Sequence, residues 1–328
     1  MSNYMSLVNN LYQKEKLEQK PTRDGYGEGL VELGKKNPNV VALGADLTGS
    51  TRCNWFKDEF PDRFIQVGIA EQNMIGIATG LALLGKVPFA STYSVFCPGR
   101  NWDQIRISVA YNKTNVKLTG AHAGISVGPD GATHQGLEDI AITRCLPNMT
   151  VLAPCDMIET KKATIAAGEM IGPVYLRFAR EPTPIFTTEK THFRIGQAEV
   201  FRKGKDASII ACGPIVYEAL LAAEELSKEG IDVRVINNHT IKPIDEEEII
   251  KAAEQTGAIV TGEDHQVMGG LGSAVAEVLG KNHPVPIEMI GVQNRFGESG
   301  QTDELMKEFG LIAVNIKQAV KKVIKRKI

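Results

Sequence analysis

The chain has 328 residues, and 37 lysines and arginines against 39 aspartates and glutamates give a formal net charge of -2. This balance argues against a nucleic-acid-binding protein, which would carry a basic excess or stripe. The longest apolar stretch, Met74 to Leu84, is too short to cross a bilayer, and the N-terminus has no apolar signal-peptide core. The five cysteines form no Cys-x-x-Cys pair and the six histidines lack zinc-site spacing, so we expect free thiols in a cytoplasmic protein and no metal ligands.

Residues 1–20 read as a polar helical arm, and residues 24–36 as a helix that Gly34 and Pro38 end. Short apolar runs that read as buried strands then alternate with helical segments. The expected strands cover residues 40–44, 64–67, 87–90, 116–119, 149–153 and 174–178. The expected helices begin near Ala70, Asp103, Leu137 and Met157. This alternation predicts a parallel, doubly wound sheet.

Residues 182–190 have the composition of a linker, and a second alternating series begins after Gly196. Its expected strands cover residues 207–211, 233–236, 258–261 and 287–290, and its helices residues 216–229, 246–255, 271–279 and 303–309. The tail, residues 316–327, reads as an amphipathic helix with a solvated basic face. The sequence therefore predicts two doubly wound α/β domains, of which the second is smaller.

The most informative single residue is Glu71, in the first turn of the helix that follows strand 64–67. The helix continues with Ile75 to Leu84, which is apolar nearly all round, so we expect the helix to be buried. A buried carboxylate is costly unless it has a partner or holds a proton. Glu71 therefore has a dedicated hydrogen-bond partner or works on a proton, unless it is simply a helix-start carboxylate favoured by the dipole.

Ligands of open α/β sheets bind at the carboxyl ends of the strands, and polar or aromatic side chains collect at five strand ends here. In chain order they are Asp46, Leu47 and Ser50; Glu71; Tyr93 and Phe96; His122, Asp130 and His134; and Arg180. This clustering predicts a functional face. Taken singly, each has a structural alternative: Arg180 could pair with Glu181, for example, and Phe96 could belong to the core.

No Gly-x-Gly-x-x-Gly fingerprint follows a predicted strand, and no P-loop is present. The segment from Gly120 to Gly136 is rich in glycine but lacks that spacing. We therefore interpret it as a flexible loop that lines the substrate.

Several of these residues lie in motifs that resemble the transketolase family of thiamine-diphosphate enzymes. The motifs are Gly68-Ile-Ala-Glu-Gln-Asn-Met74, Ser91-Thr-Tyr-Ser-Val-Phe96, Gly128-Pro-Asp-Gly-Ala-Thr-His-Gln135, Leu146-Pro-Asn-Met149 and Ala153-Pro-Cys-Asp156. The resemblance implies an N-terminal arm (residues 1–20), a thiamine pyrimidine-binding domain (21–186), a linker (187–195) and a transketolase C-terminal domain (196–328), where the motifs are weaker.

One departure from the family pattern concerns the cofactor diphosphate. Full-length transketolases begin with a diphosphate-binding domain that carries Gly-Asp-Gly and a downstream metal-ligating Asn, and this sequence has no Gly-Asp-Gly. The resemblance thus implies the C-terminal subunit of a split transketolase. We expect thiamine diphosphate as the cofactor, Mg²⁺ or Ca²⁺ held by a diphosphate-binding partner subunit, and a heterotetramer with two copies of each chain.

The resemblance also implies roles for the residues at the strand ends. Glu71 would hydrogen-bond the ring nitrogen of the aminopyrimidine and help the cofactor to lose its thiazolium proton. Phe96 would stack on the pyrimidine, Tyr93 would line the same pocket, and Leu47, with Asp46 beside it, would prop the cofactor into its bent shape. The sugar phosphate would be gripped by Arg23, Ser50, His122 and Arg180, while Asp130 and His134 would read sugar hydroxyls, His134 also serving as a catalytic residue.

The expected reaction is transfer of a two-carbon ketol unit from a ketose phosphate to an aldose phosphate, as in the pentose phosphate pathway. Three alternatives stay open: a subunit similar to 1-deoxyxylulose-phosphate synthase, the beta subunit of a 2-oxo acid dehydrogenase, and a catalytically dead regulatory or assembly subunit. Arg23, Ser50 and His122 together favour a phosphosugar. Intact Glu71, Phe96 and His134 speak against a dead subunit.

Overall fold

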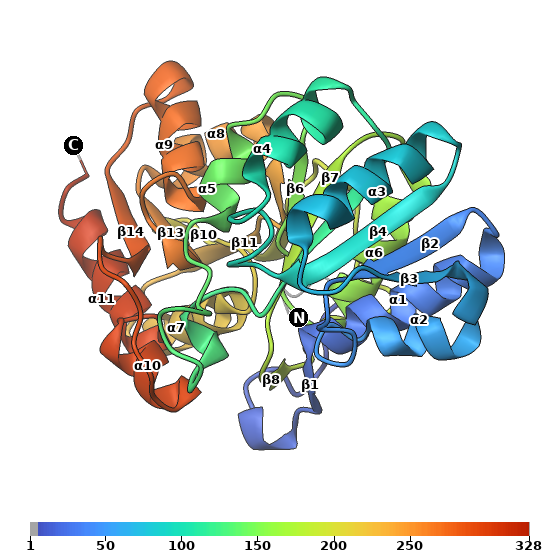
Figure 1. Ribbon diagram of the computed structural model, residues 1–328. Helices are drawn as coiled ribbons and strands as arrows, with labels where there is room; N and C mark the ends of the chain where they lie inside the picture. Colours follow the sequence, from blue (N-terminus) through green and yellow to red (C-terminus); the bar gives the residue numbers. More distant parts are fainter. Residues whose placement is uncertain (1–5, 328) are drawn as a thin grey trace.

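The computed structural model describes residues 6–327. Two α/β units lie side by side, and helices flank the sheet of each (Figure 1). The first unit has a seven-stranded sheet of order β12-β6-β7-β5-β4-β2-β3, and the second a five-stranded sheet of order β14-β13-β10-β11-β9. The predicted fold class, two α/β domains with a mostly parallel sheet in the first, is confirmed.

The first unit contains six mutually parallel strands and the helices that connect them. The strands are β2 (Val40–Gly44), β3 (Phe64–Gln66), β4 (Val87–Tyr93), β5 (Lys117–Ala121), β6 (Thr150–Leu152) and β7 (Val174–Phe178). The helices are α1 (Thr22–Lys36), α2 (Cys53–Glu59), α3 (Glu71–Leu83), α4 (Trp102–Gln104), α5 (Asp139–Arg144) and α6 (Met157–Glu169). Helix α4 continues as the π-helix η3 (Ile105–Tyr111), and 3₁₀ turns cover η1 (Lys14–Lys16), η2 (Pro61–Arg63) and η4 (Ile125–Val127).

The sheet of the second unit is parallel except for one antiparallel edge strand, β9. Its strands are β9 (Glu199–Arg202), β10 (Ala207–Ala211), β11 (Val233–Asn237), β13 (Ile259–Gln266) and β14 (Ile287–Val292). Its helices are α7 (Ile215–Lys228), α8 (Glu246–Thr256), α9 (Leu271–Asn282), α10 (Thr302–Glu308) and α11 (Ala313–Ile324). Among residues 6–327, no helix is long and apolar enough to span a membrane.

The carboxyl edge of the five-stranded sheet faces the first unit and is joined to it by hydrogen bonds. Strand β12 (Thr240–Lys242), from the second half of the chain, pairs antiparallel with β6 and so extends the first sheet. Beside it, Ala153 N–H donates to the His239 carbonyl at 2.8 Å, and Gly213 N–H donates to the Ala153 carbonyl at 3.0 Å. The two sheets are therefore held in one fixed arrangement.

The prediction of a helical arm at the N-terminus is wrong for the part that the structure describes; residues 1–5 lie outside it. Residues 6–18 form only the short turn η1, and β1 (Gln19–Pro21) pairs with β8 (Pro182–Pro184) inside the predicted linker. Leu7, Leu11 and Leu17 are buried in the core of the second unit. The Leu11 carbonyl accepts a hydrogen bond from the Tyr217 hydroxyl (3.0 Å), so tertiary contacts replace helical ones.

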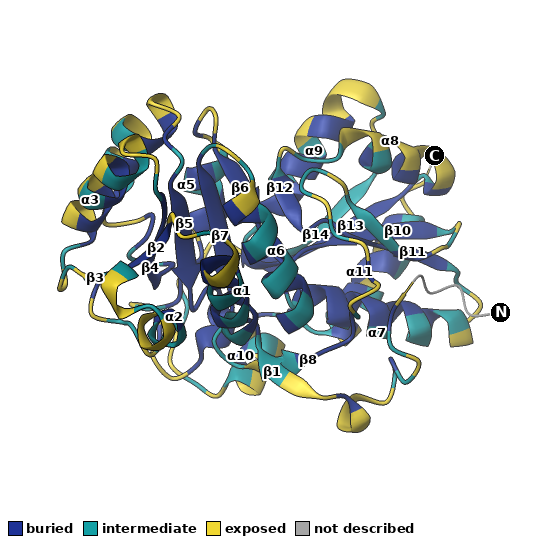
Figure 2. Ribbon diagram, turned by 90° about the vertical axis from the view of Figure 1, so that its right-hand side faces the viewer, coloured by how far each residue is buried: buried dark blue, intermediate teal, exposed yellow. Residues whose placement is uncertain are grey.

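The prediction that the Glu71 helix is buried all round is also wrong. Helix α3 buries the side that carries Glu71, Met74, Ile75 and Ala78, which faces the sheet. Its other side is open to solvent in this chain, as Figure 2 shows. Burial in the core of this chain therefore does not explain the apolar residues on the exposed side of α3.

Candidate functional site

The predicted site residues follow strands that are neighbours in the sheet. The sheet order β7-β5-β4-β2-β3 places the five strand ends along one edge, because these strands are parallel. One refinement concerns Tyr93, which is the last residue of β4 rather than part of the loop after it. The edge therefore presents side chains from widely separated parts of the sequence to one another.

Glu71 has a dedicated partner, as expected for a buried carboxylate, but the sequence analysis did not identify that partner as Arg100. Its side chain is 1% exposed, and Arg100 Nη1 donates to Oε2 at 2.9 Å. The Asn101 side-chain amide donates to the backbone carbonyl of Glu71 at 3.4 Å. Among the described residues none donates to Oε1, so this second carboxylate oxygen can bond a ligand. The only sequence signal for Arg100 is a cation shortly after the aromatic motif that ends at Phe96.

Aromatic rings form a layer beside this carboxylate. Tyr93 stacks on Phe96 with centroids 6.0 Å apart and 15° between the planes, and on His122 at 4.0 Å and 22°. His134 presents its edge to Phe96 at 5.6 Å. The Arg100 guanidinium carbon lies 4.3 Å from the Phe96 ring centroid, so one cation contacts both Glu71 and the aromatic layer.

His122 starts the loop after β5 and is held in an uncommon conformation. Its φ of 55° lies in the left-handed region, where a non-glycine residue is disfavoured unless its surroundings hold it. The Ser94 hydroxyl donates to the His122 carbonyl at 3.2 Å. Burial, followed by the positive charges of Arg23 and Arg180, lowers the pKa of His122 to about 3, so the imidazole is neutral at physiological pH.

Arg23 and His122 are brought together across the sheet edge. Arg23 Nη1 donates to His122 Nε2 at 3.1 Å and to the Ser50 carbonyl at 3.1 Å. Ser50 thus contacts Arg23 through its backbone rather than its hydroxyl. Arg23 Nε and His122 Nδ1 are buried with no protein partner among the described residues. A buried polar atom without a hydrogen-bond partner lowers the stability of the fold, and a polar ligand could supply the missing hydrogen bonds.

The remaining predicted residues lie around this centre. Arg180 donates to Asp130 Oδ1 at 3.0 Å and pairs with Glu181 at 3.2 Å, so the predicted Arg180–Glu181 ion pair is present. His134 Nδ1 lies 2.9 Å from the Thr133 hydroxyl. Leu47 packs against the core of the first unit, whereas Asp46 is exposed, with φ at 62°.

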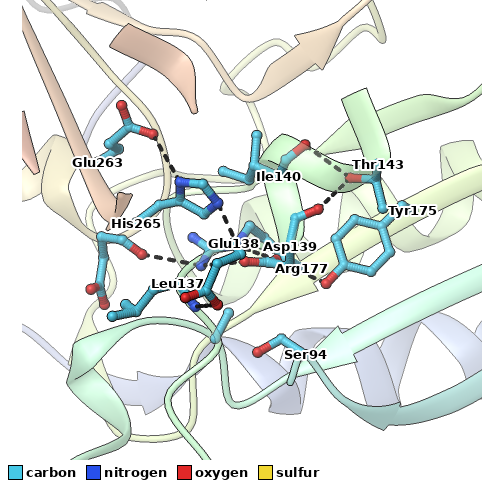
Figure 3. A network of polar contacts seen from close by, with 12 residues as sticks. Ser94, Leu137, Glu138, Asp139, Ile140, Thr143, Tyr175, Arg177, Glu263 and His265 are labelled. Atoms are coloured by element: carbon cyan, nitrogen blue, oxygen red, sulfur yellow. Dashed lines mark hydrogen bonds and ion pairs between the residues drawn. The ribbon is translucent and has the colours of Figure 1, made fainter. Parts of the chain in front are cut away.

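A buried polar network lies behind the site, between the two units (Figure 3). Arg177 on β7 binds the Asp139 carboxylate with two nitrogens, at 2.9 Å and 3.3 Å, and the Tyr175 hydroxyl donates to the same carboxylate at 2.8 Å. His265 on β13 reaches this group, with Nε2 at 3.9 Å from Asp139 Oδ1. Burial lowers the pKa of His265 to about 4, so this contact involves a neutral ring at physiological pH.

Comparison with known proteins agrees with the resemblance seen in the sequence. Residues 18–184 match the family described as "Transketolase, pyrimidine binding domain", and residues 196–316 match "Transketolase, C-terminal domain". The chain is 49% identical to a putative transketolase C-terminal section of Methanocaldococcus jannaschii, over 94% of this chain and 97% of that one. It is 45% identical to the 6-deoxy-6-sulfo-D-fructose transketolase subunit SqwH of Clostridium sp. (strain MSTE9), over 95% and 97%.

Longer relatives and solved structures give the same assignment. The chain is 41% identical to human transketolase over 92% of its own length, but it spans only 49% of that protein. A solved structure titled "Split gene transketolase, inactive beta4 tetramer" superimposes with a TM-score of 0.88 at 45% identity, over 94% of this chain and 99% of that one. The chain belongs to the transketolase family and corresponds to the C-terminal subunit of its split form.

Proposed function

We propose that this chain binds the pyrimidine half of thiamine diphosphate at Glu71 and, with a diphosphate-binding partner subunit, transfers a two-carbon ketol unit between sugar phosphates. The observation that carries the proposal is the buried Glu71 carboxylate beside the Phe96 ring. One of its oxygens is held by Arg100, and the other has no donor among the described residues.

The residues at this edge fit an aminopyrimidine. Glu71 Oε1 can bond a ring nitrogen and share a proton with it, while Arg100 keeps the carboxylate in one orientation. Phe96 and Tyr93 offer flat apolar surfaces on which a heterocycle can stack. When bound, thiamine supplies a carbon nucleophile and an electron sink for cleavage of a carbon–carbon bond. Leu47 and Asp46, at the end of β2, are proposed to contact the same cofactor.

The cationic group beside it fits the anionic end of a sugar phosphate. Guanidinium groups bind phosphate with two parallel hydrogen bonds, and Arg23 and Arg180 both lie close enough to the buried His122 to lower its pKa. If His122 Nε2 accepts from Arg23, the proton of the neutral ring is on Nδ1, which can donate to a substrate oxygen. Asp130 and His134 extend this group toward sugar hydroxyls, as the sequence predicts.

The uncovered side of α3 supports a partner subunit. Large apolar side chains near the two ends of α3 and on the adjacent η3 are exposed to solvent. They are Ile69 (73% exposed), Leu83 (74%), Leu84 (82%) and Tyr111 (77%). Large apolar side chains that are exposed on neighbouring elements favour an interaction surface. We propose that the partner covers this surface, holds Mg²⁺ or Ca²⁺ with the cofactor diphosphate, and assembles with this chain as two plus two copies. The solved tetramer of a relative, which contains four copies of one subunit, is titled inactive, and this agrees with a need for a second kind of subunit.

Relatives broaden the range of substrates to be tested. Besides the sulfofructose enzyme, the chain is 38% identical to one subunit of an apulose-4-phosphate transketolase from Phocaeicola vulgatus, over 88% of this chain and 93% of that one. The sulfosugar, apulose 4-phosphate and a ketose phosphate all carry an anionic group that arginines can bind. We propose a ketose phosphate of the pentose phosphate pathway as the donor, and a sulfosugar as the second candidate because of the 45% identity to SqwH.

The five unpaired cysteines support a cytoplasmic location.

The test is an assay of this chain mixed with the diphosphate-binding subunit, thiamine diphosphate and Mg²⁺. We expect Glu71→Gln to lower ketol transfer by about 100-fold or more, since a group that handles a proton is lost. Glu246→Gln is the matched control, because Glu246 also lies in a helix first turn but is exposed on α8. An inert wild-type mixture with no larger species in light scattering would refute the proposal, and so would near-normal turnover of Glu71→Gln.

A further inference from the structure

The loop that carries His122, Asp130 and His134 is held by the second unit along its length. The hydroxyl of Thr302, at the start of α10, donates to the Ser126 carbonyl at 3.1 Å. The Gln135 side chain donates to the Glu298 carbonyl at 3.0 Å. The segment predicted from the sequence to be a flexible loop is therefore anchored at Ser126 and at Gln135 by residues of the C-terminal domain.

Asp264, at the carboxyl end of β13, makes the closest of these contacts. Its Oδ1 accepts from Ile125 N–H at 2.7 Å, and its Oδ2 accepts from the Ser126 hydroxyl at 2.7 Å and from Ser126 N–H at 3.3 Å. Gly124 allows this approach, since a Cβ at that position would lie 2.0 Å from the carboxylate. The φ of Gly124 is also positive, at 88°, so glycine is required for two reasons.

Asp264 is itself fixed from the other side. Arg177 Nη2 donates to the Asp264 carbonyl at 3.1 Å while the same guanidinium binds Asp139. Figure 3 shows Arg177 and Asp139 between β7 and α5, with His265 approaching from β13. An anchor built from buried, paired groups can hold a loop in one conformation, because movement would leave charges unpaired.

We propose that Asp264 is a positioning residue for substrate binding, which holds the backbone of residues 124–126 and thereby fixes His122 and His134 at the site. This inference rests on the proposed function and extends it by giving the C-terminal domain a role in substrate affinity. Asp264 does not touch the site residues themselves. It acts through the loop, whose start at His122 lies two residues before Gly124.

The first test needs neither the partner nor any activity. Hydrogen–deuterium exchange of the full chain should show amides 124–128 exchanging about tenfold faster in Asp264→Asn, since the loss of roughly one charged hydrogen bond changes an opening equilibrium by that factor. The matched control is Glu263→Gln. Glu263 is also buried on the same strand, but its oxygens accept from Leu271 N–H and Gly272 N–H, both at 2.7 Å and both in α9.

The second test uses the reconstituted enzyme. We expect Asp264→Asn to raise KM for the phosphorylated donor about tenfold while kcat at saturation stays within about threefold, because uniform substrate binding is lost. Glu263→Gln should change thermal stability and leave KM unchanged. Ser126→Ala removes one contact from the loop side and should raise KM by about three- to fivefold, so the inference can be tested even if Asp264→Asn does not fold.

The outcomes separate the two proposals. Unchanged exchange at residues 124–128 in Asp264→Asn, or an equal rise of KM in Glu263→Gln, would overturn the positioning role. Faster exchange with a normal KM would overturn it as well. If the wild-type mixture is inert while the exchange result is as expected, the proposed function fails and only the anchoring of the loop stands.

Discussion

The two sheets are both mostly parallel but differ in strand order, and their carboxyl edges differ in what lies against them. At the edge of the first sheet, buried polar atoms such as Arg23 Nε and His122 Nδ1 have no protein partner among the described residues. At the edge of the second sheet, Glu263 and Asp264 each accept at least two hydrogen bonds. Both edges are the usual place for ligands. In this chain the edge of the second sheet is bonded to the first unit, through Asp264 and Arg177 for example, and is therefore closed to a ligand.

The covered edge contributes rigidity instead. Asn237, at the end of β11, donates to Glu159 in the first unit at 2.7 Å, and burial raises the pKa of that carboxyl group to about 7. Arg177, which is paired with Asp139 in the first unit, donates to the Asp264 carbonyl in the second unit at 3.1 Å. These contacts join the two units through polar groups that are costly to separate. Buried polar atoms without a partner among the described residues lie at both edges, among them Asn237 Oδ1 and His265 Nε2 at the interdomain edge. The two edges therefore differ in whether the other unit covers them and not in how completely their polar atoms are paired.

The strongest predicted effect comes from disrupting the covered edge. Asp139→Ala leaves the buried Arg177 guanidinium without its anion, so we expect the free energy of unfolding to fall by about 3–5 kcal/mol. Urea denaturation of the full chain measures this loss. The control is Asp130→Ala, whose partner Arg180 is partly exposed and for which about 1 kcal/mol or less is expected. Equal losses in the two variants would show that the two edges do not differ as described.

The next prediction defines the role of the open edge. Arg180→Ala should raise KM for a phosphorylated ketose by roughly 10- to 100-fold, which corresponds to a lost charged hydrogen bond of about 1.5–3 kcal/mol. Stability should change little, because this guanidinium is partly exposed. Steady-state assays with phosphorylated and unphosphorylated donors separate the effects, and equal changes for both would contradict a phosphate role.

A third prediction concerns pH and the buried imidazole. The pKa of His122 is about 3 in the folded chain against an ordinary 6.5, so the unfolded chain binds more protons between these values and stability falls as pH falls. Relative to His122→Gln, wild type should lose about 2 kcal/mol of unfolding free energy between about pH 7 and pH 5, at roughly 1.4 kcal/mol per unit below the unfolded pKa. The remaining histidines are the same in both proteins, so their contributions cancel in the comparison. Parallel stability curves for the two proteins would argue against a neutral buried His122.

The weakest predicted effect on the isolated chain tests the surface of α3. Leu84→Ser should change stability by about 0.5 kcal/mol or less, since the side chain is largely exposed. It should nevertheless weaken assembly with the diphosphate-binding subunit, because an apolar contact is lost there. Ile171→Ser is the matched control, as Ile171 is 88% exposed but far from α3 in the sequence and beyond α6. Sedimentation of the mixtures should distinguish the two, and identical assembly would remove this surface from the proposed interface.

Local patterns in the sequence were sufficient for most of the regular elements of both units, though not for α2, β9 or β12. Strands 40–44, 174–178 and 207–211 have the predicted bounds, and α6 begins at Met157, where a helix start was predicted. Each is a continuous apolar run or a capped periodic segment, whose conformation depends mainly on near neighbours in the chain. Helix α2 was missed, because a seven-residue element with two buried side chains carries little periodicity.

Contacts between distant segments were not readable from the same patterns. Nothing near residues 240–242 indicates that this strand joins the sheet of the other unit, and nothing near Glu71 indicates Arg100 as its partner. The arm is irregular because its leucines are buried by the second unit rather than by their own turn. Each of these outcomes depends on which surfaces meet after the chain has folded.

The alternation of strands and helices, the presence of Glu71, Phe96 and His122 at strand ends, and the motifs that indicate the transketolase family all follow from the amino-acid order. Only the tertiary structure shows that the carboxyl edge of the first sheet stays open while the edge of the second sheet holds the loop of residues 122–136. Only the tertiary structure shows that one side of α3 is exposed to solvent in this chain. The cause is a difference in range: backbone propensity and hydrophobic period act over a few residues, whereas burial and pairing of polar groups depend on the whole packed molecule.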